Sequence, residues 1–254
     1  MRRLCISLAL AAIAAKPAAA EELLVAAAVS LRGPLEAIAE RFEAAHAGAQ
    51  VQLAFGASSA LSAQARAGAP FDVFLAADEE SIDALAAAGL VRAGSRKTIA
   101  GNRLVVVASA DLKAPIESAA DLARPEVRRI ALAERAVPVG HYAREWLAGR
   151  GILEALAPRF VATEHARATL AAVDAGNADA GIVYATDVKA ARSARVAFTP
   201  PEAEQPRIVY VAALLTSGRA PALAGAFLAE LGDPAARRDF EAAGFPPPPG
   251  DPAP

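Results

Sequence analysis

Two long apolar runs, GNRLVVVAS at residues 101–109 and RIVYVAALL at residues 207–215, decide how this chain must fold. Both are rich in Val, Leu and Ile, as strands are when both of their faces are buried. Shorter strand-like and helix-like segments alternate before, between and after them, which is typical of α/β folds. If the first run leads the chain into a second lobe and the second run leads it back, two α/β lobes are joined by two strands.

This interpretation divides a chain of 254 residues, which is long enough for one large domain or two smaller ones. Residues 21–102 and 207–245 form lobe one, residues 103–206 form lobe two, and residues 246–254 form a proline-rich tail. The pattern alone leaves open a single continuous doubly wound sheet. Two lobes on a paired hinge leave a cleft beside the carboxyl ends of the strands, where ligands bind in open α/β sheets.

The first twenty residues have the pattern of a cleavable secretory signal peptide. A basic MRR start precedes the apolar stretch Leu4–Ala15, and Ala18–Ala20 provides an A-x-A cleavage site. A lysine and a proline interrupt the apolar stretch too early for a membrane span, which needs about 20 apolar residues. The single cysteine, Cys5, lies inside this segment, so a mature chain from Glu21 has no thiol and no disulfide. We therefore expect a periplasmic protein.

The net charge of the mature chain indicates which kinds of ligand and partner it can bind. Removal of residues 1–20 takes away two arginines and one lysine, so 26 − 3 = 23 Lys and Arg face 28 Asp and Glu, and the mature chain carries about −5. No basic patch interleaved with aromatic residues occurs, which argues against nucleic acid as a partner. An anionic ligand must therefore be held by local hydrogen-bond donors and not by the overall charge.

Small or hydroxyl-bearing residues stand at four predicted strand-to-helix corners. A helix start leaves its first N–H groups unpaired and carries a partial positive charge, so converging helix starts bind an anion without Lys or Arg. A tyrosine at the end of a predicted strand adds a phenol donor. The corners are AAVSLRGPL at Ser30, FGASSAL at Ser58, AVPVGHYAREW at Val139–Gly140 and TEHARATL at Glu164–Ala166, and the tyrosine is Tyr184 in GIVYATD.

Enzyme classes fit the sequence less well. The stretch GASSA at residues 56–60 resembles the nucleophile elbow of a serine hydrolase, but it lacks the second glycine. A hydrolase also needs a base near Ser58, and His46, His141 and His165 are better interpreted as surface or first-turn residues. No pair of histidines has i, i+4 spacing and no H-E-x-x-H motif occurs, so no metal site is predicted. We expect no catalytic residues.

Five motifs, FGASSAL, AGAPFDVFLAAD, GNRLVVVA, AVPVGHYARE and GIVYATD, occur in this order along the chain. Together they resemble the periplasmic molybdate-binding proteins of ABC transporters, over about residues 24–245. The resemblance implies a two-lobe periplasmic-binding-protein fold of type II, with mixed sheets flanked by helices and a two-strand hinge. It also implies a receptor that binds molybdate or tungstate and delivers the oxyanion to a membrane permease. We expect this receptor to be a monomer and to use no cofactor.

The resemblance assigns the ligand-binding residues. The family's two serines match the hydroxyls of Ser30 and Ser58, its two backbone donors match the N–H groups of Val139 and Ala166, and its tyrosine matches Tyr184. Four positions depart from the family pattern. Val139 is often alanine there, His165 replaces a common acidic residue, Ala166 replaces a bulkier apolar residue, and Ala57 replaces a serine of some members. These departures bear on affinity and on the balance between molybdate and tungstate.

The chemistry of these residues agrees with such a ligand. Molybdate and tungstate are fully ionised near neutral pH and offer only acceptors, so their site needs only donors. Hydrogen phosphate keeps a proton and calls for a carboxylate acceptor, whereas Asp78 and Glu164 are better interpreted as helix-start residues. Sulfate also offers only acceptors. A receptor for another small anion, such as sulfate or an organic acid, therefore remains the alternative.

Overall fold

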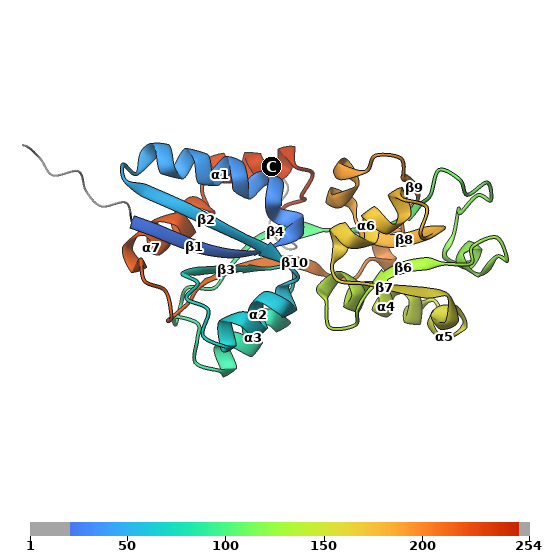
Figure 1. Cartoon of the computed structure of the whole chain (residues 1–254), viewed down its shortest axis with the longest axis horizontal. Helices are drawn as coiled ribbons and strands as arrows, with labels where there is room; N and C mark the ends of the chain where they lie inside the picture. The colour runs from blue at the N-terminus through green and yellow to red at the C-terminus, as the bar shows by residue number, and fades with distance from the viewer. Residues whose placement is uncertain (1–20, 249–254) are drawn as a thin grey trace, which may run out of the picture.

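The computed structural model describes residues 21–248, so the predicted signal peptide and residues 249–254 of the predicted tail lie outside the described residues. The chain forms two α/β lobes, each built on its own five-stranded sheet (Figure 1). The strand order is β2-β1-β3-β10-β4 in the first sheet and β7-β6-β8-β5-β9 in the second. The prediction of two lobes with mixed sheets is confirmed, and the single continuous sheet is not formed.

In lobe one, β1, β2 and β3 are parallel, and β10 runs antiparallel between β3 and β4. The strands are β1 (Glu21–Ala28), β2 (Ala49–Gly56), β3 (Val73–Ala76), β4 (Lys97–Asn102) and β10 (Ile208–Leu214). Figure 1 shows α1 (Arg32–Ala45) and α7 (Pro221–Glu230) on one face of this sheet and α2 (Ser58–Arg66) and α3 (Glu80–Ala87) on the other. The last helix, α8 (Pro234–Ala242), packs beside α1.

Alternation along β1 explains why both faces of this sheet are covered. Val25 and Ala27 belong to the same buried cluster as Phe42 of α1. Ala26 points the other way and belongs to the cluster that contains Leu61 of α2. Successive side chains of a strand project to opposite faces, so a strand that is apolar throughout must be buried on both.

In lobe two, β6, β7 and β8 are parallel, while β5 runs antiparallel between β8 and β9. The strands are β5 (Leu104–Ala108), β6 (Ile130–Ala133), β7 (Phe160–Thr163), β8 (Ala180–Tyr184) and β9 (Arg195–Phe198). The α-helices are α4 (Pro138–Gly149), α5 (Leu153–Leu156) and α6 (Ala166–Asp174). Five 3-10 helices complete the described chain: η1 (Val29–Leu31), η2 (Ala119–Ala123), η3 (Ala157–Arg159), η4 (Ala185–Ala190) and η5 (Glu202–Glu204).

The chain passes between the lobes at two places. The first predicted long strand is divided at Arg103, since β4 ends at Asn102 in one sheet and β5 begins at Leu104 in the other. The return passage is the segment 199–207, which contains η5 and connects β9 to β10. At the start of the predicted tail, the carbonyl of Pro246 accepts a hydrogen bond of 2.8 Å from the Gly101 N–H of β4. Among residues 21–248, no helix is long and apolar enough to cross a membrane.

Candidate anion-binding site

All five residues predicted for the ligand site line one cavity between the lobes. Lobe one contributes the chain that follows β1, β2 and β3, and lobe two contributes the starts of α4 and α6 and the end of β8. The lining residues are Ala28, Val29, Ser30, Gly56, Ala57, Ser58, Ala77, Val137, Pro138, Val139, His165, Ala166 and Tyr184. The four corners and the tyrosine, which are far apart in the sequence, therefore meet at one place.

Two helices begin at the cavity without a side chain to cap them. Ala57 precedes α2 and Val137 precedes α4, and neither residue has a side chain that accepts a hydrogen bond. The first N–H groups of both helices therefore have no capping acceptor, and the positive ends of the helix dipoles are directed at the cavity. This is the arrangement in which helix starts bind anions.

The third helix start, at α6, differs. Here the Nδ1 atom of His165 accepts a hydrogen bond of 3.0 Å from the N–H of Ala168, so His165 is a capping residue that also lines the cavity. This role was not predicted for His165. His165 accepts from Ala168 and not from Ala166, and Ala166 lines the cavity. The N–H of Ala166 therefore stays available to a ligand.

The two predicted serine hydroxyls are both buried, and each has one hydrogen-bond partner within the protein. Ser58, which is 1% exposed, accepts a hydrogen bond of 3.0 Å from the N–H of Ala77. Because that N–H occupies the acceptor side of the hydroxyl, the Ser58 proton is left for a further partner. Ser30 Oγ lies 2.9 Å from the hydroxyl of Tyr210 on β10. The neighbouring Ser59 lines an adjacent groove instead of the cavity.

Tyr184 places a phenol hydroxyl in the cavity wall that no other group of the described chain engages. Its side chain is 2% exposed, and its hydroxyl has no hydrogen-bond partner within residues 21–248. Burial raises the pKa of this phenol well above its ordinary value, so it stays protonated and is a donor. A buried hydroxyl left unpaired costs about 1–3 kcal/mol, which an acceptor in the cavity would relieve.

The cavity contains no carboxylate, lysine or arginine among the residues that line it. Asp78 accepts a hydrogen bond of 3.1 Å from the N–H of Ser81 at the start of α3 and faces the adjacent groove, as expected for a helix-start residue. Glu164 is exposed. Within the described chain, the cavity therefore offers no carboxylate to accept the proton of a ligand such as hydrogen phosphate.

The cavity is also small. It offers about 20 Å³ to the centres of water-sized atoms, whereas one water needs roughly 10–15 Å³ by the same measure. Space on this scale favours a compact ligand and is too small for an organic acid of many atoms.

The nucleophile and base of a serine hydrolase are not assembled around Ser58 in the described part of the chain. Its hydroxyl is engaged by a backbone N–H, and no histidine nitrogen is hydrogen-bonded to it in the described chain. His141 is exposed, and His46 binds the Phe42 carbonyl at the end of α1. Within residues 21–248, no group of three or more His, Cys, Asp or Glu side chains is placed to hold a metal ion.

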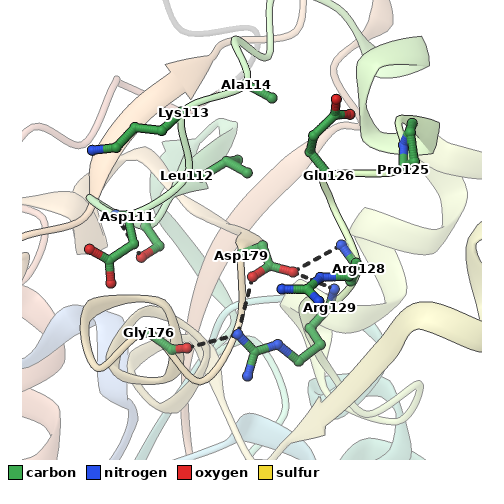
Figure 2. Close-up of a pocket in the computed structure, with 11 residues that line it drawn as sticks. Asp111, Leu112, Lys113, Ala114, Pro125, Glu126, Arg128, Arg129, Gly176 and Asp179 are labelled. Atoms are coloured by element: carbon green, nitrogen blue, oxygen red, sulfur yellow. Dashed lines mark hydrogen bonds and ion pairs between the residues drawn. The ribbon is translucent and has the colours of Figure 1, made fainter.

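A larger hollow of about 600 Å³ lies beside the amino ends of β6 and β8 and the carboxyl end of β5 in lobe two (Figure 2). Asp179, just before β8, accepts hydrogen bonds from the backbone N–H groups of Arg128 and Arg129 at 2.9 and 2.8 Å. The Arg129 guanidinium binds the same carboxylate at 3.1 Å and the Gly176 carbonyl at 3.0 Å (Figure 2). The charges of Asp179 and Arg129 thus neutralise each other within the protein. None of the five predicted site residues lines this hollow.

A two-lobe α/β protein whose donor-lined cavity lies between its lobes belongs to the class of receptors that enclose a small solute. Comparison with known families agrees, since residues 23–246 match the family model of bacterial extracellular solute-binding proteins. The chain therefore belongs to the bacterial extracellular solute-binding proteins.

Individual relatives agree with the resemblance seen in the motifs. The chain is 36% identical to the molybdate-binding protein ModA of Mycobacterium tuberculosis over 227 residues, which cover 89% of this chain and 85% of the relative. It is 34% identical to ModA of Escherichia coli over 229 residues, covering 88% of each chain. The resemblance to molybdate-binding proteins of ABC transporters is thus confirmed.

Solved structures give the same result for the fold. The periplasmic molybdate-binding protein of Azotobacter vinelandii aligns with a TM-score of 0.80 at 30% identity, covering 89% of this chain and 99% of that chain. The sulfate-binding protein SubI of Mycobacterium tuberculosis aligns with a TM-score of 0.79, but at 20% identity it shows a shared fold only.

Several residues around the cavity were not predicted from the sequence. Tyr210 stands behind Ser30, and the N–H of Ala77 engages Ser58. Tyr210 interrupts an otherwise aliphatic strand, which is the one local signal that marks it. Ala77 ends the DVFLAA run and carries no such signal, because its contribution is a backbone N–H whose partner depends on the packing of β3 against α2.

Proposed function

We propose that this protein is a periplasmic receptor that binds molybdate, and also tungstate, in the cavity between its lobes. The observation that carries the proposal is a buried, compact cavity that presents donors and no carboxylate, with the unpaired hydroxyl of Tyr184 among them. The relatives named molybdate-binding proteins support the choice of ligand. The receptor acts as a monomer without catalysis, reaches the periplasm through a cleaved signal peptide, and delivers the oxyanion to the membrane permease of an ABC transporter.

In this proposal the oxyanion accepts hydrogen bonds from five groups. They are the hydroxyls of Ser30, Ser58 and Tyr184 and the backbone N–H groups of Val139 and Ala166. A hydrogen bond to a charged partner contributes roughly 1.5–3 kcal/mol. Five such bonds, less the cost of closing the lobes, are consistent with a binding free energy of about −8 kcal/mol or better, which is a dissociation constant below about 1 µM.

Calorimetric titration of the mature protein with molybdate, tungstate, sulfate and phosphate tests the proposal. We expect molybdate and tungstate to bind with dissociation constants below about 10 µM, and phosphate to bind far more weakly. Tight binding of sulfate with no binding of molybdate would instead make the protein a sulfate receptor and contradict the choice of ligand.

Serine variants test the assigned site. Ser30→Ala and Ser58→Ala should each weaken molybdate binding by about tenfold or more, because each removes one donor to a charged ligand. Ser59→Ala is the matched control, since Ser59 is the adjacent serine of the same helix and lies outside the cavity. If the double variant of Ser30 and Ser58 binds molybdate as tightly as the Ser59 variant does, the site is wrongly assigned.

A further inference from the structure

A chain of buried hydrogen bonds runs from the cavity into the hinge. Ser30 Oγ lies 2.9 Å from the Tyr210 hydroxyl, and Asn102 Nδ2 lies 3.0 Å from the same hydroxyl. Asn102 Nδ2 also donates to Thr186 Oγ1 at 2.9 Å. Asn102 ends β4 and Tyr210 lies on β10, both in lobe one, whereas Thr186 follows β8 in lobe two. All four side chains are buried.

The amide and backbone donors fix the direction of the hydrogen bonds at Asn102, and the direction of the bond between Tyr210 and Ser30 follows from the protons that remain. The backbone N–H of Arg103 donates to Asn102 Oδ1 at 2.8 Å, so the amide oxygen must face Arg103. The two protons of Asn102 Nδ2 are therefore directed at Thr186 and Tyr210. Because Tyr210 accepts from Asn102, its own proton has one partner available within residues 21–248, namely Ser30 Oγ.

The direction of the Tyr210 proton determines the direction of the Ser30 hydroxyl. With a lone pair occupied by the Tyr210 proton, the Ser30 hydroxyl keeps its own proton for the cavity and faces the ligand as a donor. Ser58 is directed in the same way by the Ala77 N–H, but a backbone N–H is always a donor and cannot be reversed by substitution. Ser30 is different, because side chains determine its direction.

We propose that Asn102 and Tyr210 are positioning residues that hold Ser30 as an obligate donor and so favour fully deprotonated oxyanions over those that keep a proton. This inference rests on the proposed function, in which Ser30 contacts the ligand. Hydrogen phosphate carries a proton that needs an acceptor. While Tyr210 donates to Ser30, the Ser30 proton has only the ligand as a partner, so Ser30 could accept from hydrogen phosphate only by leaving its own proton unpaired. Reversal of the chain would turn Ser30 into that acceptor.

Asn102→Asp reverses the chain with almost no change of shape. The new carboxylate accepts from Arg103, Thr186 and Tyr210, so the Tyr210 proton turns toward residue 102 and Ser30 can donate to Tyr210. The added negative charge weakens the binding of every anion. Molybdate and hydrogen phosphate are both dianions, so that effect cancels in the ratio of their dissociation constants and the change in the ratio reports the direction of Ser30.

The experiment measures both dissociation constants at about pH 8, where phosphate is chiefly the dianion that keeps one proton. Molybdate is titrated calorimetrically, and phosphate is measured by displacement of molybdate. We expect Asn102→Asp to shift the ratio of dissociation constants toward hydrogen phosphate by about tenfold or more. In this variant Ser30 no longer donates a hydrogen bond to molybdate, but it can accept one from hydrogen phosphate. Tyr210→Phe removes the proton that holds Ser30 in this direction without adding charge. A water in the space of the lost phenol oxygen can then accept from Ser30, so the ratio should shift in the same direction by about threefold or more.

Thr186→Val is the matched control, because it perturbs the same network from lobe two but leaves Asn102 donating to Tyr210. Its ratio should equal that of the parent protein. The inference is overturned if the ratio is unchanged in both Asn102→Asp and Tyr210→Phe, or if Thr186→Val shifts it equally. If Asn102→Asp does not fold, Tyr210→Phe decides alone. Failure of the parent protein to bind molybdate contradicts the proposed function separately, and the ratio is then measured with sulfate.

Discussion

Replacement of Tyr184 by phenylalanine should change the stability of the ligand-free protein and its affinity for molybdate in opposite directions. The side chain is buried in the cavity wall, and its hydroxyl has no partner among residues 21–248. Phenylalanine keeps the ring, which meets the ring of Tyr210 edge-on at a centroid distance of 6.0 Å, and removes only the hydroxyl. The substitution therefore isolates one polar group.

The burial of this hydroxyl determines the expected magnitudes. Because no group of the described chain pairs with this hydroxyl, its removal costs the ligand-free protein no internal hydrogen bond, and Tyr184→Phe should stabilise that state by up to about 1 kcal/mol. For a chain of this size that corresponds to a rise in melting temperature of about 2–4 °C. With ligand bound, the variant lacks a donor to a charged partner worth roughly 1.5–3 kcal/mol, so affinity should fall by about tenfold to a hundredfold.

Thermal melts without ligand and calorimetric titration with molybdate measure the two effects. Tyr142→Phe is the control, because Tyr142 is a similarly buried tyrosine of α4 that does not line the cavity. Its affinity should stay within about twofold of the parent. If Tyr184→Phe lowers the melting temperature and leaves molybdate affinity unchanged, the hydroxyl has a structural partner and no role toward the ligand, and the reasoning is refuted.

Three further predictions concern the cavity wall and its surroundings. A Cβ on Gly140 would collide with the carbonyl oxygens of Ala133 and Glu134, so Gly140→Ala should displace the start of α4, destabilise the fold by about 1–3 kcal/mol and weaken molybdate binding in calorimetry by about tenfold. Gly149→Ala in the same helix meets nothing within 4 Å and should change neither property adversely; equal behaviour of the two variants would contradict this account. Burial raises the pKa of Asp187 to about 6 despite its ion pair with Arg167 at 2.8 Å. The folded state thus binds this proton more tightly than the unfolded state, and the contribution of Asp187 to unfolding free energy should fall by about 3 kcal/mol as pH rises from about 4 to about 6. Urea unfolding at several pH values should show that Asp187→Asn lacks this decrease. If the unfolding free energy falls equally with pH in both proteins, the raised pKa of Asp187 is not the cause. Finally, molybdate at about 100 times its dissociation constant should stabilise the protein by about 2.7 kcal/mol in melts, an effect that should vanish in the double variant of the cavity serines.

Much of the fold was predictable because its signals are local. The apolar runs and the corners between strands and helices are contained in stretches of about ten residues, and most of the predicted strands and helices are present. Strand β9 was missed because it is a short strand at the edge of its sheet, with Arg195 and Val196 exposed and no alternating apolar pattern. The division of the first long strand at Arg103 was missed too, because Leu104 and the residues after it continue the same strand-like composition.

The sequence by itself determined which groups are available to the ligand. Hydroxyl and phenol side chains and uncapped helix starts stand at predictable corners, so local patterns are sufficient to single out the donors Ser30, Ser58 and Tyr184. Their binding role stays a prediction, but the structure brings all of them to one cavity.

Only the tertiary structure decided how those groups are directed. The partner that orients Ser30 is 180 positions away at Tyr210, and the amide that orients Tyr210 is 108 positions from it at Asn102. The physical reason is that a hydroxyl is both donor and acceptor, so its direction depends on which neighbour it meets in space. That neighbour is determined by the antiparallel pairing of β10 with β4, which brings distant parts of the chain together at the hinge.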